Sequence, residues 1–167
     1  MPKNFLVFLG IGLAVVGVVI VLTLFGTRGA HLSLTGNVLK VRTMATDENN
    51  TLAVIDFRVH NTASETPFVI KDAIVTVTTA DGKDVEGMTV ARRDMDRIFD
   101  AYKLIGPKYN QSLIPSDRVA GAQTIDRMIA SAFPLKESAV EKRRNLRVRF
   151  VELDGATSEI SENPASK

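Results

Sequence analysis

The stretch TLAVIDFRVHN, from Thr51 to Asn61, decides which fold class the rest of the chain must build. Apolar and polar residues alternate along it, so that one side of an extended strand carries Ala53, Ile55, Phe57 and Val59. The other side carries Asp56, Arg58 and His60. A period of two residues is typical of a β-strand with one packed face and one solvated face. The stretch therefore predicts a strand of an antiparallel sheet, with His60 as a solvated residue rather than a catalytic base.

Segments with the same pattern occur on both sides of this strand, separated by turn-forming residues such as Asp81–Gly82. They run over 31–43, 67–71, 73–79, 85–90, 146–153 and 157–161. The alternation in the first of them slips near Gly36–Asn37, which predicts a β-bulge. Six or seven short strands are typical of an antiparallel β-sandwich, and we expect that fold for residues 31–155.

Residues 92–105 change to a helical period. Apolar residues spaced i, i+3, i+4 and i+7 form one stripe, made of Met95, Ile98, Phe99 and Tyr102. This predicts a short amphipathic helix that stops before Gly106–Pro107. A sandwich needs only strands and turns, so functional specificity is expected in such a structured connection. We treat the stripe as a candidate partner or ligand surface; the alternative is that it caps an open end or edge of the domain.

The later part of the chain is less regular. The apolar residues of 116–133 satisfy both a helical and a strand period, and Gly121 with the β-rich surroundings favours a strand. Residues 137–144 predict a brief helix. The polar end over 156–167 predicts a loose tail, although 157–161 has the pattern of a final edge strand.

Two sequence motifs resemble those of a known kind of domain. AVIDFRVHNTASETPFVI, from Ala53 to Ile70, resembles the strand–Asn–Thr–turn–strand unit of membrane-anchored immunoglobulin-like domains and of the late-embryogenesis-abundant type of β-sandwich. LIPSDRVAG, from Leu113 to Gly121, is similar to the proline-containing turn before a late strand in those domains. The resemblance covers 39–155 and implies an immunoglobulin-like sandwich that serves as an accessory or binding domain, with no catalytic residues. The helical insertion departs from that pattern.

An apolar stretch, FLVFLGIGLAVVGVVIVLTLF, precedes the β-rich region, and its 21 residues from Phe5 to Phe25 carry no charge. As a helix rising about 1.5 Å per residue it is roughly 31 Å long, close to the ~30 Å hydrocarbon core of a bilayer. It is longer than the apolar region of a cleaved signal peptide. The sequence therefore predicts an uncleaved transmembrane helix (signal anchor), with residues 1–4 as an N-terminal tail and 26–30 as a linker.

The charges flanking this span do not settle its orientation, because Lys3 precedes it while Arg28 and further basic residues follow it. The usual layout of a short tail, one span and an exported β domain favours an extracytoplasmic domain. Within the span, Gly10, Ala14 and Gly17 lie at i, i+4 and i+7. Such small-residue stripes let membrane helices approach closely, so the sequence predicts a homodimer through this helix.

Composition narrows the function classes. Lys and Arg number 21 and Asp and Glu 19, and this near-balance argues against nucleic acid as a partner. The chain has no cysteine, which excludes disulfides, thiolate metal sites and a lipoprotein anchor. No HExxH, GxSxG, P-loop or GxGxxG motif occurs. We therefore expect no catalytic residues, metal or cofactor.

These observations lead to one hypothesis and one alternative. The hypothesis is a single-pass, membrane-anchored, non-enzymatic β-sandwich that binds or assembles with a protein partner at the cell envelope. The alternative is a small-ligand or lipid-binding carrier, in which the helix at 92–105 acts as a lid over a cavity between the sheets.

Overall fold

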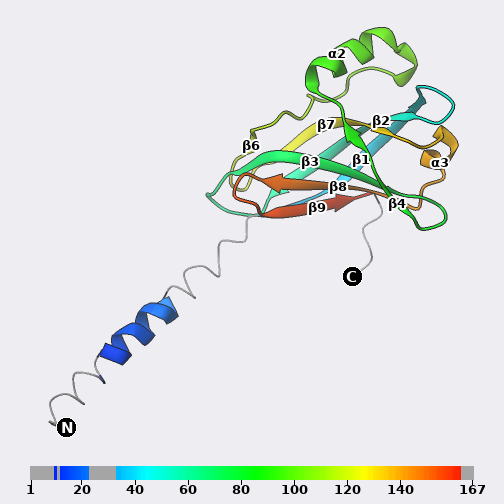
Figure 1. Cartoon of the computed structure of the whole chain (residues 1–167). Coiled ribbons are helices and arrows are strands. Elements are labelled where there is room, and N and C mark those ends of the chain that lie inside the picture. Colours follow the sequence, from blue (N-terminus) through cyan, green and yellow to red (C-terminus); the bar gives the residue numbers. More distant parts are fainter. Residues whose placement is uncertain (1–9, 11, 23–32, 163–167) are drawn as a thin grey trace. The chain divides into compact units, whose positions relative to one another are not determined.

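The structure is a computed structural model that describes residue 10, residues 12–22 and residues 33–162. The chain divides into two units, Met1–His31 and Leu32–Lys167. In the first unit residues 10 and 12–22 are helical and include Gly10, Ala14 and Gly17 (Figure 1). Within the described part of the chain, no helix is long and apolar enough to cross a membrane. The predicted tail, the predicted linker and both ends of the predicted span lie outside the described residues.

The second unit is mainly β, and its named strands pair antiparallel in two sheets (Figure 1). Sheet A has the order β1 (Leu34–Ala45), β2 (Thr51–Asn61), β7 (Thr124–Phe133) and β5 (Met88–Thr89). Sheet B has the order β4 (Asp84–Glu86), β3 (Phe68–Thr78), β8 (Asn145–Glu152) and β9 (Thr157–Ser161), and β6 (Asp117–Val119) also pairs with β3. The predicted antiparallel, mainly-β class is confirmed, and the arrangement is consistent with a β-sandwich.

The main core lies between the two sheets. Inward-facing residues of β2, such as Ile55 and Phe57, share it with residues of β3 and β8. The rings of Phe57 and Phe150 are fully buried, with centroids 5.2 Å apart and planes inclined by 52°. Each such ring contributes about 1.5–3 kcal/mol by leaving water. The alternating pattern of β2 thus specifies the packed face as predicted.

Three predicted strand segments are divided differently in the structure. The segments 67–71 and 73–79 form the single strand β3, because a bulge between Ile70 and Asp72 shifts the register without ending the ladder. Conversely, 85–90 splits into β4 on sheet B and β5 on sheet A. Gly87 lies at this crossing, where a Cβ atom would approach Ser131 Oγ to 2.4 Å. Only glycine fits there without displacing the side chains of Ser131 and Phe133.

Other differences concern the ends of elements. The bulge in β1 lies between Val38 and Lys40, slightly later in the chain than the predicted place near Gly36–Asn37. The strand alternative for 116–133 is confirmed over β7, and the brief helix is α3 (Glu137–Glu141). β9 pairs with β8 and buries Ile160, so the predicted edge strand over 157–161 is confirmed and the predicted loose tail is wrong for these residues.

A second, smaller core lies on the outer face of sheet A. The first half of β2 is buried on both faces, because Leu52 and Val54 pack outward against Met128 and Ala130 of β7. The cover is α2 (Arg92–Ala101) followed by the 3₁₀ turn η1 (Lys103–Ile105). The predicted solvated face of β2 is therefore wrong at Asp56, which is buried.

Candidate functional site

The helical insertion forms an arm, residues 92–113, that lies along the outer face of sheet A (Figure 1). The predicted stripe is divided between packing and exposure. Met95 is buried, Ile98 and Phe99 are half-buried against the second core, and Tyr102 is exposed. The stripe thus covers a sheet face rather than an open end or edge, and only its last residue faces solvent.

The arm is clamped to the sheet by Arg42 of β1. Its Nη1 donates to the carbonyl oxygens of Ile105 at 2.9 Å and Pro107 at 2.8 Å. Its guanidinium carbon lies 5.6 Å from the ring centre of Phe99 and 4.9 Å from that of Tyr109. Hydrogen bonds to charged donors and cation–π contacts each stabilise by about 0.5–3 kcal/mol. The side chain therefore fixes the backbone path of the turn after α2.

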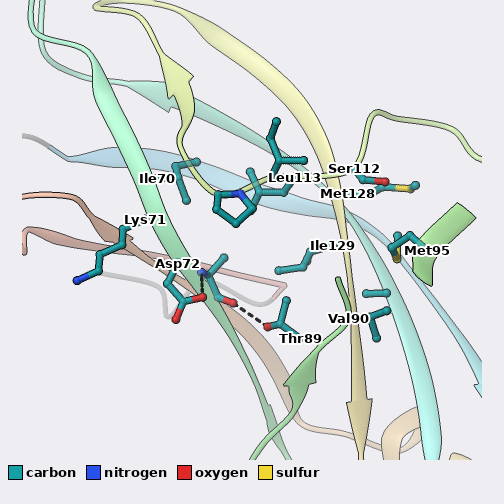
Figure 2. Close-up of a pocket in the computed structure, with 14 residues that line it drawn as sticks. Ile70, Lys71, Asp72, Thr89, Val90, Met95, Ser112, Leu113, Met128 and Ile129 are labelled. Atoms are coloured by element: carbon teal, nitrogen blue, oxygen red, sulfur yellow. Dashed lines mark hydrogen bonds between the residues drawn. The ribbon is translucent and has the colours of Figure 1, made fainter. Parts of the chain in front are cut away.

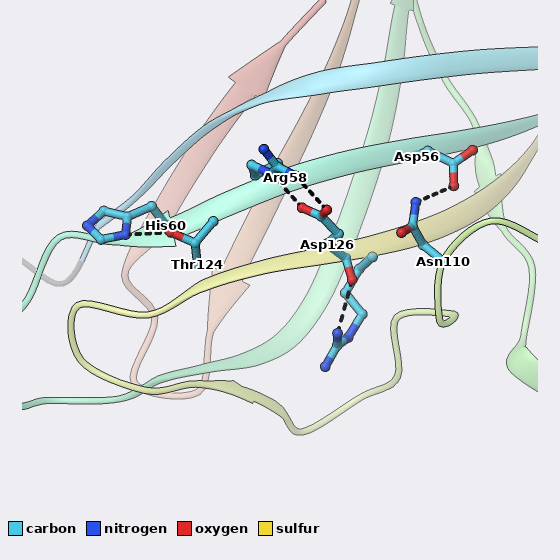
Figure 3. A network of polar contacts seen from close by, with 7 residues as sticks. Asp56, Arg58, His60, Asn110, Thr124 and Asp126 are labelled. Atoms are coloured by element: carbon cyan, nitrogen blue, oxygen red, sulfur yellow. Dashed lines mark hydrogen bonds and ion pairs between the residues drawn. The ribbon is translucent and has the colours of Figure 1, made fainter.

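The charge of Arg42 is balanced by Asp56. Arg42 Nη2 and Asp56 Oδ2 are 2.8 Å apart, and the two side chains are only 9% and 3% exposed. The second carboxylate oxygen of Asp56 accepts a hydrogen bond of 2.8 Å from Asn110 of the arm (Figure 3). A buried ion pair destabilises a fold unless its remaining polar atoms find partners. The arm supplies them for Arg42 Nη1 and for the second oxygen of Asp56, whereas Arg42 Nε has no hydrogen-bond partner among the described residues. We call the Arg42–Asp56 pair the clamp; through these contacts the clamp and the arm form one structural unit.

An exposed ion pair lies on the same face of sheet A. Arg58 of β2 donates to both oxygens of Asp126 at 2.7 and 2.8 Å, and the side chains are 54% and 33% exposed (Figure 3). The hydrogen bond from Arg58 holds the pKa of the Asp126 carboxyl below its usual range. The stability it contributes is present at neutral pH and is lost as the pH falls through that lowered pKa. His60 beside it contacts the Thr124 hydroxyl at 3.0 Å.

Several apolar side chains on and beside the clamped arm face solvent. Leu104, in η1, is 95% exposed. Tyr102, Tyr109 and Leu39 are about half exposed, and Lys40 Nζ lies 4.8 Å from the ring centre of Tyr109. A shallow hollow of about 270 Å³ is lined by Leu39, Lys40, Asp56, Tyr109 and Asn110. We call Leu39, Tyr102, Leu104 and Tyr109 the arm surface.

A separate small cavity lies where the free edge of β3 faces β7 (Figure 2). Its volume is about 60 Å³, and Ile70, Leu113 and Ile129 are among its apolar walls. The backbone of Ala73 there is satisfied by side chains, because its N–H donates to Asp72 and its carbonyl accepts from Thr89. The cavity is far smaller than the ~300–1,000 Å³ of pockets that hold small molecules.

Sequence reasoning found the stripe but missed Arg42, Asp56 and Leu104. The Arg42–Asp56 ion pair depends on how β1 and β2 align, and no sequence motif within either strand predicts it. Leu104 follows the last residue of the periodic stripe and so escapes the helical pattern. Comparisons with protein-family models, curated proteins and solved structures found no match. The site must therefore be judged on its own geometry.

Proposed function

We propose that this protein is a single-pass, membrane-anchored, non-enzymatic module that binds a partner protein through the arm surface at the cell envelope. The observation that carries the proposal is the exposure of Leu104 on a turn whose carbonyl oxygens are held by Arg42. An exposed apolar residue on a rigid support loses little conformational entropy when it is buried by a partner. Tyr102 lies two residues before Leu104, and tyrosine is enriched among the residues that dominate binding at protein interfaces.

The surroundings of the arm surface fit a protein partner. Lys40, Lys103 and Lys108 lie around its apolar residues, and Asp94, Asp96 and Asp100 line the helix before it. An apolar centre with a mixed polar rim is typical of protein interfaces. The immunoglobulin-like resemblance, which also implies a binding domain, supports the same function.

Membrane anchoring is proposed from the sequence. The uncharged run 5–25 has the length and apolarity of a transmembrane helix, and the β-rich unit follows it directly. We place that unit outside the cytoplasm, as the usual layout of such chains suggests, and we propose pairing through Gly10, Ala14 and Gly17.

The carrier alternative receives less support. The arm lies on the outer face of sheet A, where it covers Leu52 and Val54 rather than the space between the sheets. That space is filled by side chains such as Phe57 and Phe150. A binding module is therefore the better account of the arm.

Fractionation tests the anchor. The full chain is expected to stay in the membrane pellet after alkaline carbonate washing and to keep its first residues by mass spectrometry, because a helix of this apolarity does not leave the bilayer. Protease added outside intact cells or spheroplasts should digest the β-rich unit. Release by carbonate would refute the anchor, and digestion only after lysis would reverse the orientation.

Substitutions on the arm surface test partner binding. Tyr102→Ala and Leu104→Ser are each expected to reduce crosslinked partner in native membranes by roughly tenfold or more, as loss of an interface anchor does. Leu104 is 95% exposed, so Leu104→Ser should change the free energy of unfolding by less than about 0.5 kcal/mol. Tyr102 is 46% exposed, and its truncation should cost no more than about 1 kcal/mol. Leu153→Ser is the matched control, since Leu153 is also an exposed leucine but lies in the β8–β9 turn. Equal partner recovery from all three variants would refute the arm as the interface.

A further inference from the structure

A polar pocket of about 190 Å³ lies at the base of the arm, where α2 begins. Its walls come from three parts of the chain: the first residue of α2, the loop after η1, and the strands β6 and β7. Three cationic side chains take part, namely Arg92, Lys108 and Arg127. The amide of Gln111 and the hydroxyl of Ser112 add neutral donors, and Asp117 is the one carboxylate among the lining residues of this pocket.

The start of α2 is built against the usual rule for helices. The first turn carries unpaired N–H groups and the positive end of the helix dipole, so acidic or capping side chains are favoured there. Here the N-cap is Ala91, which makes no side-chain cap, and Arg92 and Arg93 follow it. Asp94 is the acidic residue of this turn. Two arginines at the positive end leave a site that an anion would stabilise.

Pairing within the pocket leaves one positive charge over. Arg127 Nε lies 2.8 Å from Asp117, and Lys108 Nζ lies 2.8 Å from Asp96. Among the ion pairs of the described residues, none involves Arg92. The hydrogen bond from Lys108, with a smaller contribution from the charge of Arg92, holds the pKa of Asp96 below its usual range. Of the three cationic side chains of the pocket, Arg92 is thus the one without a carboxylate within ion-pair distance among the described residues.

An unused donor completes the pocket. Ser112 is only 8% exposed, and its Oγ has no hydrogen-bond partner among the described residues. A buried polar atom without a partner destabilises a fold by about 1–3 kcal/mol, so its presence asks for an explanation. Ser112 lines this pocket as well as the cavity at the β3 edge. The Oγ atom is shielded from solvent, so a ligand in the pocket can accept a hydrogen bond from it only after the Ser112 side chain rotates.

We propose that this pocket binds a small tetrahedral oxyanion of the phosphate class. Its volume of about 190 Å³ is well above what a single water needs, so the pocket has room for one such ion with part of its hydration shell. Arg92 supplies the unbalanced charge, and it lies in the first turn of α2, the end of a helix that favours anions. Lys108, Gln111 and Ser112 supply donors from the loop. Binding would thereby join the start of the arm to the loop that ends it.

Titration of the full chain in detergent micelles with inorganic phosphate tests the proposal. Backbone amide signals of Arg92, Gln111 and Ser112 are expected to shift with saturation, at a Kd of about 1 mM or tighter. Sodium chloride at matched ionic strength should leave them in place. A parallel titration with glycerol phosphate distinguishes a lipid headgroup from free phosphate as the source: tighter binding than inorganic phosphate indicates the headgroup, and weaker binding indicates the free ion.

Neighbouring arginines provide the matched variants. Arg92→Gln should weaken phosphate binding by about tenfold, because one charge-assisted hydrogen bond is lost. Arg93→Gln removes the same charge from the next residue, which does not line the pocket, and should change the Kd by less than about twofold in screened solution. Both residues are exposed, so both variants should keep the spectrum of the folded chain. Linear, unsaturated shifts, or equal weakening by the two substitutions, would overturn the proposal.

Discussion

Replacing Asp56 with alanine is expected to lower the free energy of unfolding by about 3–5 kcal/mol, because the substitution leaves the buried guanidinium of Arg42 without its counter-charge. Both oxygens of the Asp56 carboxylate are engaged, one by Arg42 and the other by Asn110, at 2.8 Å each. Denaturant unfolding of the full chain in micelles, followed by circular dichroism of the β structure, measures the loss. A change of this size is a large fraction of the stability of an ordinary domain.

The exposed pair on the same sheet face provides the control. Asp126→Ala removes the partner of Arg58, which keeps access to water, and the expected loss is less than about 1 kcal/mol. The two variants delete the same chemical group from neighbouring strands. Comparable losses would contradict the view that burial of Arg42 makes its ion pair indispensable.

A double substitution separates stability from the placement of the arm. Arg42→Met with Asp56→Leu removes both charges and should recover most of the lost stability, as apolar replacement of a buried pair often does. The carbonyl oxygens of Ile105 and Pro107 then lose their donor. We expect faster amide hydrogen exchange over 103–110 and weaker partner crosslinking in a chain that is otherwise stable. Unchanged crosslinking would mean that the clamp does not prepare the arm surface.

The strands themselves were largely predictable from the sequence, because alternation is a local property of a half-buried strand. The bounds of β2 agree with the prediction, and its inward face is the one expected. The prediction was wrong where a neighbour decides the outcome. β3 continues through a bulge because β8 pairs with it on both sides of the shift. Gly87 permits the break between β4 and β5, but the sheet that each of them joins depends on its neighbours and not on the apolar pattern of 85–90.

The candidate site was predictable in part for the same reason. A helical period revealed that 92–105 had an apolar stripe, and Met95 is indeed buried. The apolar stripe does not reveal which surface it packs against, because that surface is formed by Leu52 and Val54, which are distant in the sequence. Once that face is covered, the polar position of Asp56 becomes an interior one and needs Arg42 beside it. Long-range packing thus converted a surface residue into part of the clamp.

The core pair of phenylalanines gives the second large expected effect. Phe57→Ala should lower the free energy of unfolding by about 3–5 kcal/mol, because a fully buried ring is lost and a cavity remains between the sheets. Phe99→Ala is the matched control on the arm. Its ring is only half-buried in the smaller core, so truncation should cost less than half as much.

A double-mutant cycle that combines Phe57→Ala with Phe150→Ala tests whether contact between the two rings contributes to this loss. The two rings are in contact across the sheets, so the double variant should lose about 0.5–1.5 kcal/mol less than the sum of the single variants. Phe99→Ala combined with Phe57→Ala should be additive, because the two rings lie on opposite faces of sheet A. Additivity in the first cycle would show that the rings do not pack as the structure has them. Strong coupling in the second would show that sheet A transmits strain from the core to the arm, and partner crosslinking of Phe57→Ala would then fall with stability.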